Sequence, residues 1–290
     1  MSRELATLLT GRHVDVRVHP LSFKEFLAFN AIRIPTKPLS LISPPEIQAA
    51  LKSYLTWGGL PRVVLTKNEN NKRSLLRGYL DDILFKDVAL RHNIRNMRLL
   101  KDIAIYLLTQ TSCRITYKRL AQVYDVSQSI IQNYCGYIEE SFLVSFLSIY
   151  SQKAAEINRN PKKTHCHDLG FRYISNMSST LDLGKLSETC VYNQLTCQEN
   201  DGIYYWKDFG EVDLVLRMGT EPQKFIQVVY TGSDNEMVLS REIRSLVEAH
   251  EKFPKAEKLL VTTTWPRHFP KNIPKFIKVI PLWHFLLNLK

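Results

Sequence analysis

The sequence predicts an α/β protein of several domains, in which a helical first half leads into a mixed sheet covered by helices. Between residues 70 and 140 apolar residues recur mainly at helical spacing. From residue 163 onward, short apolar runs typical of strands alternate with helical segments. A chain of 290 residues has room for two or three domains. Interleaved strands and helices imply a mixed sheet with helices on its faces.

The beginning of the chain, over 1–70, predicts short elements separated by proline-containing loops. Ser22 and Glu25 have the spacing of a capping box, in which each side chain satisfies the other residue's backbone N–H. The sequence Gly58-Gly59-Leu60-Pro61 predicts a turn that ends the last of these elements. The expected elements are a helix at 2–11, a strand at 13–18, a helix from Ser22 to Phe29 and a helix at 46–56.

The middle of the chain is expected to be helical throughout residues 70–110. Two further helices are predicted at 116–124 and 128–140, with a tight break at Asp125-Val126. Ser127 is a good N-cap for the second of these helices, because its hydroxyl can accept a hydrogen bond from the first turn. The apolar residues 142–150 suit a strand of a wing.

The C-terminal part of the chain predicts a regular succession of strands and helices. The expected strands are 163–167, 203–207, 211–217, 224–230, 257–263 and 276–280, and the expected helices are 184–199, 236–252 and 282–289.

Residues 116–138 fit a winged helix-turn-helix. Leu120, Ala121 and Tyr124 can pack against the following helix, and the small Ala121 lets the two helices approach closely. The side chains expected to point outward and reach base edges are Gln128, Ser129, Gln132 and Asn133. Those expected to contact phosphates are Arg114, Lys118 and Arg119. The second helix carries no basic residue, so a structural or protein-docking role is the alternative.

The C-terminal third resembles the PD-D/E-x-K nuclease fold. Glu188 lies in a predicted helix, Asp213 in the next-but-one strand and Gln227 in the strand after it. The resemblance implies that Glu188 and Asp213 are metal ligands and that Gln227 holds the third position of a degenerate catalytic site. Carboxylates that converge on Mg²⁺ would polarise a phosphate and activate water. Glu211 lies two residues before Asp213, so both side chains are expected on one face of their strand.

This nuclease-like site departs from the pattern at its lysine, whose position holds Val229. A valine carries no charge, and the amide of Gln227 lowers the affinity for Mg²⁺ relative to a carboxylate. Lys224 or Arg241 could replace the lysine from elsewhere in the chain. We therefore expect no cofactor and no efficient nuclease activity, with Mg²⁺ as the metal if the site is active. The alternative is that Glu188 and Asp213 are ordinary polar residues of a helix and a strand.

A wider resemblance covers the whole chain. The runs Ser2-Arg3-Glu4-Leu5, Pro20-Leu21-Ser22-Phe23, Gly58-Gly59-Leu60-Pro61 and Asp168-Leu169-Gly170 follow one another as in a prokaryotic family of AAA-type ATPases with a C-terminal domain of unknown function. The sequence contains no G-x-x-x-x-G-K-[ST] loop to hold phosphates. The resemblance implies a truncated family member that binds or associates with DNA without catalysis, or a docking subunit that completes a separate ATPase core.

This resemblance also implies a division of the chain. Residues 1–70 correspond to a remnant of the ATPase core and lid, 71–152 to the helical and winged helix-turn-helix domain, and 153–290 to the nuclease-like α/β domain.

Composition sets the expected partners. The net charge of +11 and the pI near 9.4 favour an acidic partner such as DNA. The five cysteines include no C-x-x-C pair, and the N-terminus has no apolar signal segment, so a cytoplasmic location is expected. We expect no membrane partner and no small-molecule substrate. A metal site in His165-Cys166-His167-Asp168 is disfavoured, since successive residues of a strand point to opposite faces.

Overall fold

A computed structural model describes residues 16–34, 43–175, 182–198, 200–230, 236–265 and 273–288. The helix predicted at 2–11 and the first part of the strand predicted at 13–18 lie outside these residues. Residues 16–19 are described and do not form a strand. Among the described helices, none is both long enough and apolar enough to cross a membrane.

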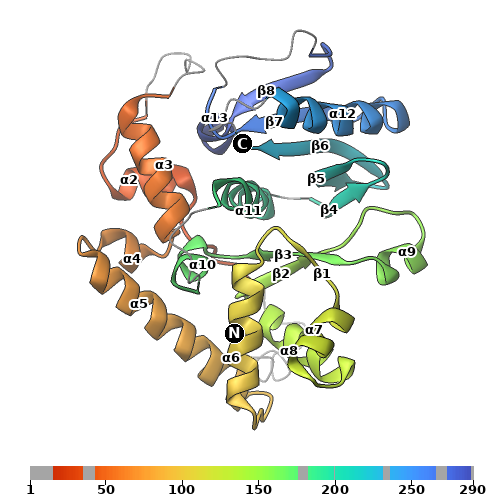
Figure 1. The fold of residues 1–290 in the computed structure, drawn as a ribbon. Coiled ribbons are helices and arrows are strands. Elements are labelled where there is room, and N and C mark those ends of the chain that lie inside the picture. Colours follow the sequence, from red (N-terminus) through yellow and green to blue (C-terminus); the bar gives the residue numbers. More distant parts are fainter. Residues whose placement is uncertain are drawn as a thin grey trace.

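The described part of the chain is mixed α/β, with a helical region and a five-stranded mixed sheet (Figure 1). Its helices are α2 (Phe23–Phe29), α3 (Pro45–Trp57), α4 (Pro61–Leu65), α5 (Glu69–Asp82), the π-helix η1 (Ile83–Leu90), α6 (Met97–Thr109), α7 (Tyr117–Tyr124), α8 (Gln128–Glu140), α9 (Ala154–Arg159), α10 (Leu169–Ser175), α11 (Leu183–Thr196), α12 (Glu236–Lys252) and α13 (Leu282–Asn288). Its strands are β1 (Arg114–Ile115), β2 (Val144–Leu147), β3 (Lys162–Cys166), β4 (Gly202–Lys207), β5 (Glu211–Met218), β6 (Glu221–Val229), β7 (Glu257–Thr262) and β8 (Ile277–Pro281).

The helix ends follow their local sequence. The hydroxyl of Ser22 accepts from the N–H of Glu25, whose carboxylate accepts from the N–H of Ser22, so the predicted capping box is confirmed. The hydroxyl of Ser127 likewise caps α8 by accepting from Ile130 N. The expectation of unbroken helix over 70–110 is wrong, because residues 91–96 separate η1 from α6. Asn96 begins α6 by accepting from Leu99 N, which supplies a second start signal inside that stretch.

The larger sheet has the order β4-β5-β6-β7-β8. Strands β4, β5 and β6 are antiparallel neighbours, whereas β6, β7 and β8 run parallel. The two faces are covered by different helices (Figure 1). Leu186 and Val191 of α11 share a core with Leu214 and Ile226, while α12 packs on the opposite face around Val215.

A smaller sheet has the order β1-β3-β2 and is antiparallel throughout. The strand expected near 163–167 is present as β3, but it pairs with β1 and β2 and not with the C-terminal sheet. Helices α6, α7 and α8 lie beside this smaller sheet (Figure 1). The two sheets are joined where Tyr205 of β4 forms a bridge with Ile149. Strand β3 is therefore held in place next to the carboxylates of α11 and β5.

Candidate functional site

Four elements bring charged side chains to one place between the two sheets. Glu188 comes from α11, Glu211 and Asp213 from β5, and Lys163 from β3. Next to Asp213 the ladder between β4 and β5 is irregular, because Asp213 and Leu214 lie opposite the single residue Tyr205. Such bulges turn side chains out of the regular alternation of a strand. Here the bulge lets Asp213 face the charged cluster while Val215 still faces the core beneath α12.

The ammonium of Lys163 lies at the centre of this cluster. Its Nζ is 2.8 Å from Glu188 Oε1, 3.1 Å from Glu211 Oε1 and 3.1 Å from Asp213 Oδ1. The Lys163 side chain is 3% exposed, so the ammonium is almost completely enclosed. The predicted common face of Glu211 and Asp213 is confirmed by their shared contact with this one atom.

Gln227 supports the cluster without facing Lys163. Its Oε1 accepts from the backbone N–H of Asp213 at 3.1 Å, and its Nε2 donates to Glu242 Oε2 at 2.6 Å. The second carboxylate oxygen of Asp213 accepts from Val228 N at 3.0 Å. Both polar ends of Gln227 are thus engaged in fixing the position of Asp213 and of Glu242 on α12.

Neither residue considered as a substitute for the missing lysine takes that position. Lys224 pairs with Glu257 of the neighbouring strand at 3.6 Å. Arg241 lies on α12 and its guanidinium binds Glu242, at 2.5 Å. Val229 is buried in the core beneath α12. The cation that meets Glu188 and Asp213 is Lys163, which lies far before Val229 in the chain and in a different sheet.

Burial and mutual repulsion shift the acids and bases of the cluster. Burial, together with the charge of Asp213, raises the pKa of Glu188 well above its ordinary value. Burial alone would lower the pKa of Lys163, but the three carboxylates raise it well above its usual range, so the lysine stays protonated. Burial raises the pKa of Glu242 and lowers the pKa of His165 well below its usual value.

The cluster opens onto a cleft of about 630 Å³. Its acidic lining residues are Asp182, Glu188, Glu211, Asp213, Glu242 and Glu248. Its basic lining residues are Lys185, Arg241 and Arg244. Acidic residues therefore outnumber basic ones in the lining of this cleft.

The carboxylates are not arranged as metal ligands. Across the described ranges, no group of three or more His, Cys, Asp or Glu side chains has a geometry that could hold a metal ion. The oxygens converge on Lys163 Nζ at distances typical of charged hydrogen bonds, whereas Mg²⁺ requires ligands at roughly 2.0–2.1 Å. The predicted metal site at Glu188 and Asp213 is thus filled by an ammonium, and the residues as placed do not fit Mg²⁺.

Six of the seven residues predicted to contact DNA are exposed on α7 and α8. Helices α7 and α8 meet at Asp125, which adopts a left-handed conformation with φ of 51°. An aspartate tolerates this conformation better than most residues, so it can stand in a turn where glycine is common. These six exposed residues are Lys118, Arg119, Gln128, Ser129, Gln132 and Asn133.

Arg114 is also exposed, but it has a partner inside the protein. Its Nε lies 3.3 Å from Glu211 Oε2, so the guanidinium reaches the carboxylate cluster from β1. Arg114 therefore joins the smaller sheet to the cleft and is not a free phosphate contact in this structure.

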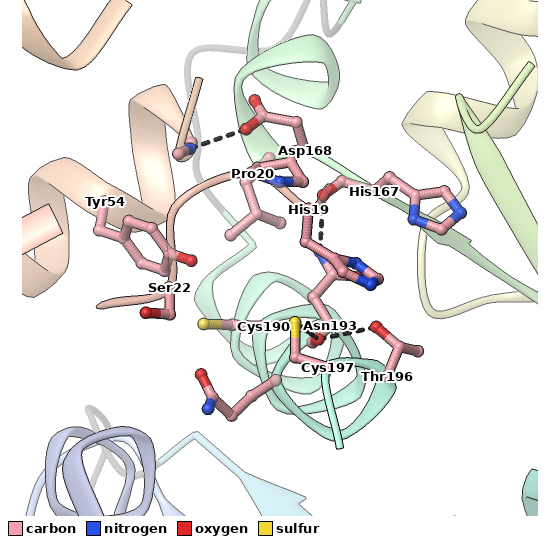
Figure 2. A pocket seen from close by; sticks show the side chains of 14 residues that line it. His19, Pro20, Ser22, Tyr54, His167, Asp168, Cys190, Asn193, Thr196 and Cys197 are labelled. Atoms are coloured by element: carbon pink, nitrogen blue, oxygen red, sulfur yellow. Dashed lines mark hydrogen bonds between the residues drawn. The ribbon is translucent and has the colours of Figure 1, made fainter. Parts of the chain in front are cut away.

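A second, small cavity of about 20 Å³ lies beside the Gly58-Gly59 turn, between the N-terminal helices and α11 (Figure 2). It has room for about one water molecule. Asp168 lines this cavity and accepts from Gly59 N at 2.7 Å through one oxygen and from Gly170 N at 2.8 Å through the other. Burial raises the pKa of Asp168 to about 6, against the opposing effect of these backbone hydrogen bonds.

The His165-Cys166-His167-Asp168 stretch is divided among separate structural contacts. His165 stacks on Tyr192 with ring centroids 4.3 Å apart, and Cys166 contacts the hydroxyl of Thr111. His167 forms a hydrogen bond with Ser145 at 2.8 Å. Each side chain thus has its own neighbours. Cys190 in α11 is buried, whereas Cys197 at the C-terminal cap of α11 is exposed.

Sequence reasoning missed Lys163, Glu242 and His165 as members of the site. Lys163 and His165 alternate along β3 and therefore point to the same side, toward Glu188. The available signal was a lysine within the short strand predicted at 163–167, since a lysine that is buried needs a charged partner. Its partners lie on other elements far along the chain, so their identity could not be read from local spacing.

Comparisons with known proteins give relatives without an assigned role. Residues 48–181 match the model of a "Domain of unknown function (DUF8612)", a range that contains the helix pair, β3 and Asp168. The chain is similar to "Uncharacterized protein MJ1544" of Methanocaldococcus jannaschii, with 30% identity over 99% of this chain and 66% of the relative. It is also similar to an "Uncharacterized protein" of Haemophilus influenzae, with 24% identity over 90% of this chain and 62% of the relative.

The chain thus spans somewhat less than two thirds of the length of either relative. No solved structure matches it.

Proposed function

We propose that this chain is a DNA-binding module of the AAA-type ATPase family named above, in which the nuclease-like domain has no catalytic role. The observation that carries the DNA-binding part is the outer face of α8. Gln128, Ser129, Gln132 and Asn133 are all exposed on a helix whose apolar side is buried against its neighbours. Uncharged amide and hydroxyl side chains on a projecting helix are suited to hydrogen bonding with base edges.

The surroundings of α8 support this assignment. Helix α7 packs on α8 through Leu120, and the β1-β3-β2 sheet lies beside the pair, as expected for a winged helix-turn-helix. Lys118 and Arg119 are exposed on α7, where they can contact phosphates. The net charge of +11 favours attraction to a polyanion.

The absence of catalysis is supported by Lys163 and Val229 together. In the nuclease pattern a lysine on the third-position strand stands beside the metal, and Val229 cannot replace it. Lys163 comes from another direction and binds the carboxylates that would hold the metal. An ammonium that is 3% exposed and surrounded by three carboxylates is shielded from a phosphate in the cleft.

Membership in the ATPase family is supported by two of its motifs lying in direct contact. In the turn at Gly58-Gly59, the backbone N–H of Gly59 donates a hydrogen bond to the carboxylate of Asp168 in the Asp-x-Gly stretch. This contact gives both motifs a structural role that is independent of bound nucleotide. A separate ATPase core remains the partner that the family resemblance implies.

The test of DNA binding is fluorescence anisotropy with a short labelled duplex across a salt series. The double variant Gln132→Ala and Asn133→Ala should weaken binding to a preferred duplex by roughly thirtyfold or more, since each well-placed base contact contributes about 1–3 kcal/mol. The matched control is Asn70→Ala with Asn71→Ala, two adjacent exposed amides on α5. Binding that does not depend on salt, or equal losses in both double variants, would contradict the proposal and favour a protein-docking subunit.

A metal-dependent nuclease is the second candidate, favoured by the contact of Lys163 with Glu188 and Asp213. A lysine that reaches these carboxylates from β3 could replace the one missing at Val229. Plasmid nicking in Mg²⁺ or Mn²⁺, compared between wild type and Asp213→Ala, distinguishes the candidates. Cleavage that disappears in Asp213→Ala would establish the nuclease, and the absence of cleavage in both is the expected result.

A further inference from the structure

We infer that the ammonium of Lys163 is a built-in cation that takes the place of a divalent metal among Glu188, Glu211 and Asp213. The native chain thereby keeps this cleft closed to metal, and removing the ammonium creates a metal site. This rests on the non-catalytic part of the proposed function and is independent of DNA binding by α8.

The enclosure of the ammonium is the first support. One nitrogen lies within 3.1 Å of oxygens from three different carboxylates, on two different elements. The backbone of Lys163 is fixed on both sides, since it pairs with Arg114 of β1 and with Leu147 of β2. The side chain itself is 3% exposed, so the ammonium is enclosed by the cluster that it contacts.

A buried imidazole nitrogen beside the cluster is the second support. Glu188 Oε1 is buried, and Lys163 Nζ is its charged partner at 2.8 Å. His165 Nε2 is buried without a hydrogen-bond partner and lies 3.9 Å from that oxygen. The other ring nitrogen of His165 lies near the hydroxyls of Ser112 and Thr189, which can fix the ring orientation. An imidazole nitrogen and a carboxylate oxygen are both metal ligands.

Charge is the third support. With Lys163 present, one ammonium and the guanidinium of Arg114 face three carboxylates. Without the ammonium, the buried cluster loses its central positive charge, and its carboxylates must either bind protons or find another cation. A divalent cation would restore the neutralisation, since it prefers oxygen ligands of this kind.

The protein contains a matched control in a second buried lysine. Lys258 on β7 is 1% exposed, and its ammonium donates to the backbone carbonyls of Phe253 and Ala256, the latter at 2.7 Å. Neither acceptor is a carboxylate. Loss of Lys258 should therefore destabilise the fold without creating a site that a divalent cation could fill.

The experiment measures thermal unfolding of wild type, Lys163→Ala, Lys163→Met and Lys258→Ala, each with EDTA and with millimolar Mn²⁺. We expect Mn²⁺ to leave wild type and Lys258→Ala unchanged. Both Lys163 variants should lose roughly 10 °C in Tm with EDTA, as is typical when one partner of a buried charge cluster is removed from a chain of this size. Mn²⁺ should recover at least half of that loss, and adding Asp213→Asn should abolish the recovery.

Three outcomes would overturn the inference. Mn²⁺ could raise the Tm of wild type but not that of Asp213→Asn, which would show that the metal displaces Lys163. Folded Lys163 variants could fail to respond to Mn²⁺. Finally, both variants could remain unfolded even with Mn²⁺, although a metal able to replace the ammonium should restore folding. A failure of duplex binding by α8 would leave each of these measurements intact, so the two proposals can fail separately.

Discussion

The carboxylate of Asp168 accepts a hydrogen bond from the backbone N–H of Gly59, 109 residues earlier in the chain, at 2.7 Å. Its other oxygen accepts from Gly170 N at the start of α10. Asp168 is 3% exposed, so these bonds form away from water and link the turn after α3 to the end of β3. The close approach needs glycine, because a Cβ on Gly58 would lie 2.0 Å from an Asp168 oxygen.

Replacing Asp168 by alanine should destabilise the protein strongly. The change leaves the buried N–H groups of Gly59 and Gly170 without acceptors, and each unsatisfied buried donor costs about 1–3 kcal/mol. We expect a loss of roughly 3 kcal/mol or more in the free energy of unfolding, measured by urea denaturation. The control is Asp82→Ala, which removes only an exposed pair with Lys86. Similar losses in both variants would show that Asp168 does not hold the turn.

Asp168 should also make stability depend on pH. Burial raises the pKa of its carboxyl from 3.8 to about 6, so the folded state binds the proton more tightly than the unfolded state. The resulting stabilisation is fully present below pH 3.8 and is lost as the pH rises through 6, an effect of about 3 kcal/mol. From pH 4 to about pH 6.5, the free energy of unfolding of wild type should therefore fall relative to that of Asp168→Asn. A flat difference across this range would contradict the raised pKa of Asp168.

The turn itself can be tested at Gly59. A Cβ at this position would lie 2.4 Å from the carbonyl oxygen of Leu21, so Gly59→Ala forces the backbone apart. We expect a loss of roughly 1–3 kcal/mol in chemical denaturation. Gly78 in α5 is the matched control, since nothing lies within 4 Å of its added Cβ. Gly78→Ala should stabilise by up to about 1 kcal/mol, because alanine favours the helix. Equal effects of the two changes would show that the turn can relax.

The order of the elements was predictable wherever the signal was local. The capping box at Ser22 and the N-cap at Ser127 are confirmed, and the predicted bounds 236–252 and 128–140 are those of α12 and α8. These features depend on residues within a few positions of one another, where propensity and capping decide. The predicted helix boundaries were wrong at residues 91–96, where the helical spacing of apolar residues continues but Asn96 starts a new helix.

The centre of the candidate site could not be predicted, because it is made by long-range packing. Glu188 and Asp213 were found through their order along the chain, but Lys163 meets them only because β3 pairs with β1 and β2. No rule of spacing connects residue 163 to residue 213. Lys224 and Arg241 lie much nearer to residue 213 in the sequence, but Lys224 pairs with Glu257 and Arg241 with Glu242.

The phosphate contacts proposed for α7 predict a change in salt dependence. Replacing Lys118 and Arg119 by glutamine should weaken duplex binding regardless of sequence. It should also make the slope of log K against log[salt] shallower by roughly 1–2, since each lost phosphate contact contributes about 0.9. Lys67→Gln with Arg77→Gln removes the same charge from two other exposed positions and is the control. An equal slope change in the control would assign the effect to net charge and not to the helix pair.

Lys258 should make stability depend on pH in the opposite direction to Asp168. Burial lowers the pKa of its ammonium from 10.5 to about 8, so the unfolded state binds this proton more tightly than the folded state. Below pH 8 the lysine is charged in both states and its burial costs stability. As the pH rises from 8 toward 10.5, the folded protein holds a neutral amine, and stability should increase.

Lys258→Met removes the titrating group, so wild type should gain stability relative to this variant over that range in urea denaturation. Lys255→Met, at an exposed position, is the control and should follow wild type. If wild type and Lys258→Met keep a constant difference from pH 8 to 10, then the two backbone carbonyls hold the ammonium charged, and burial does not control its titration.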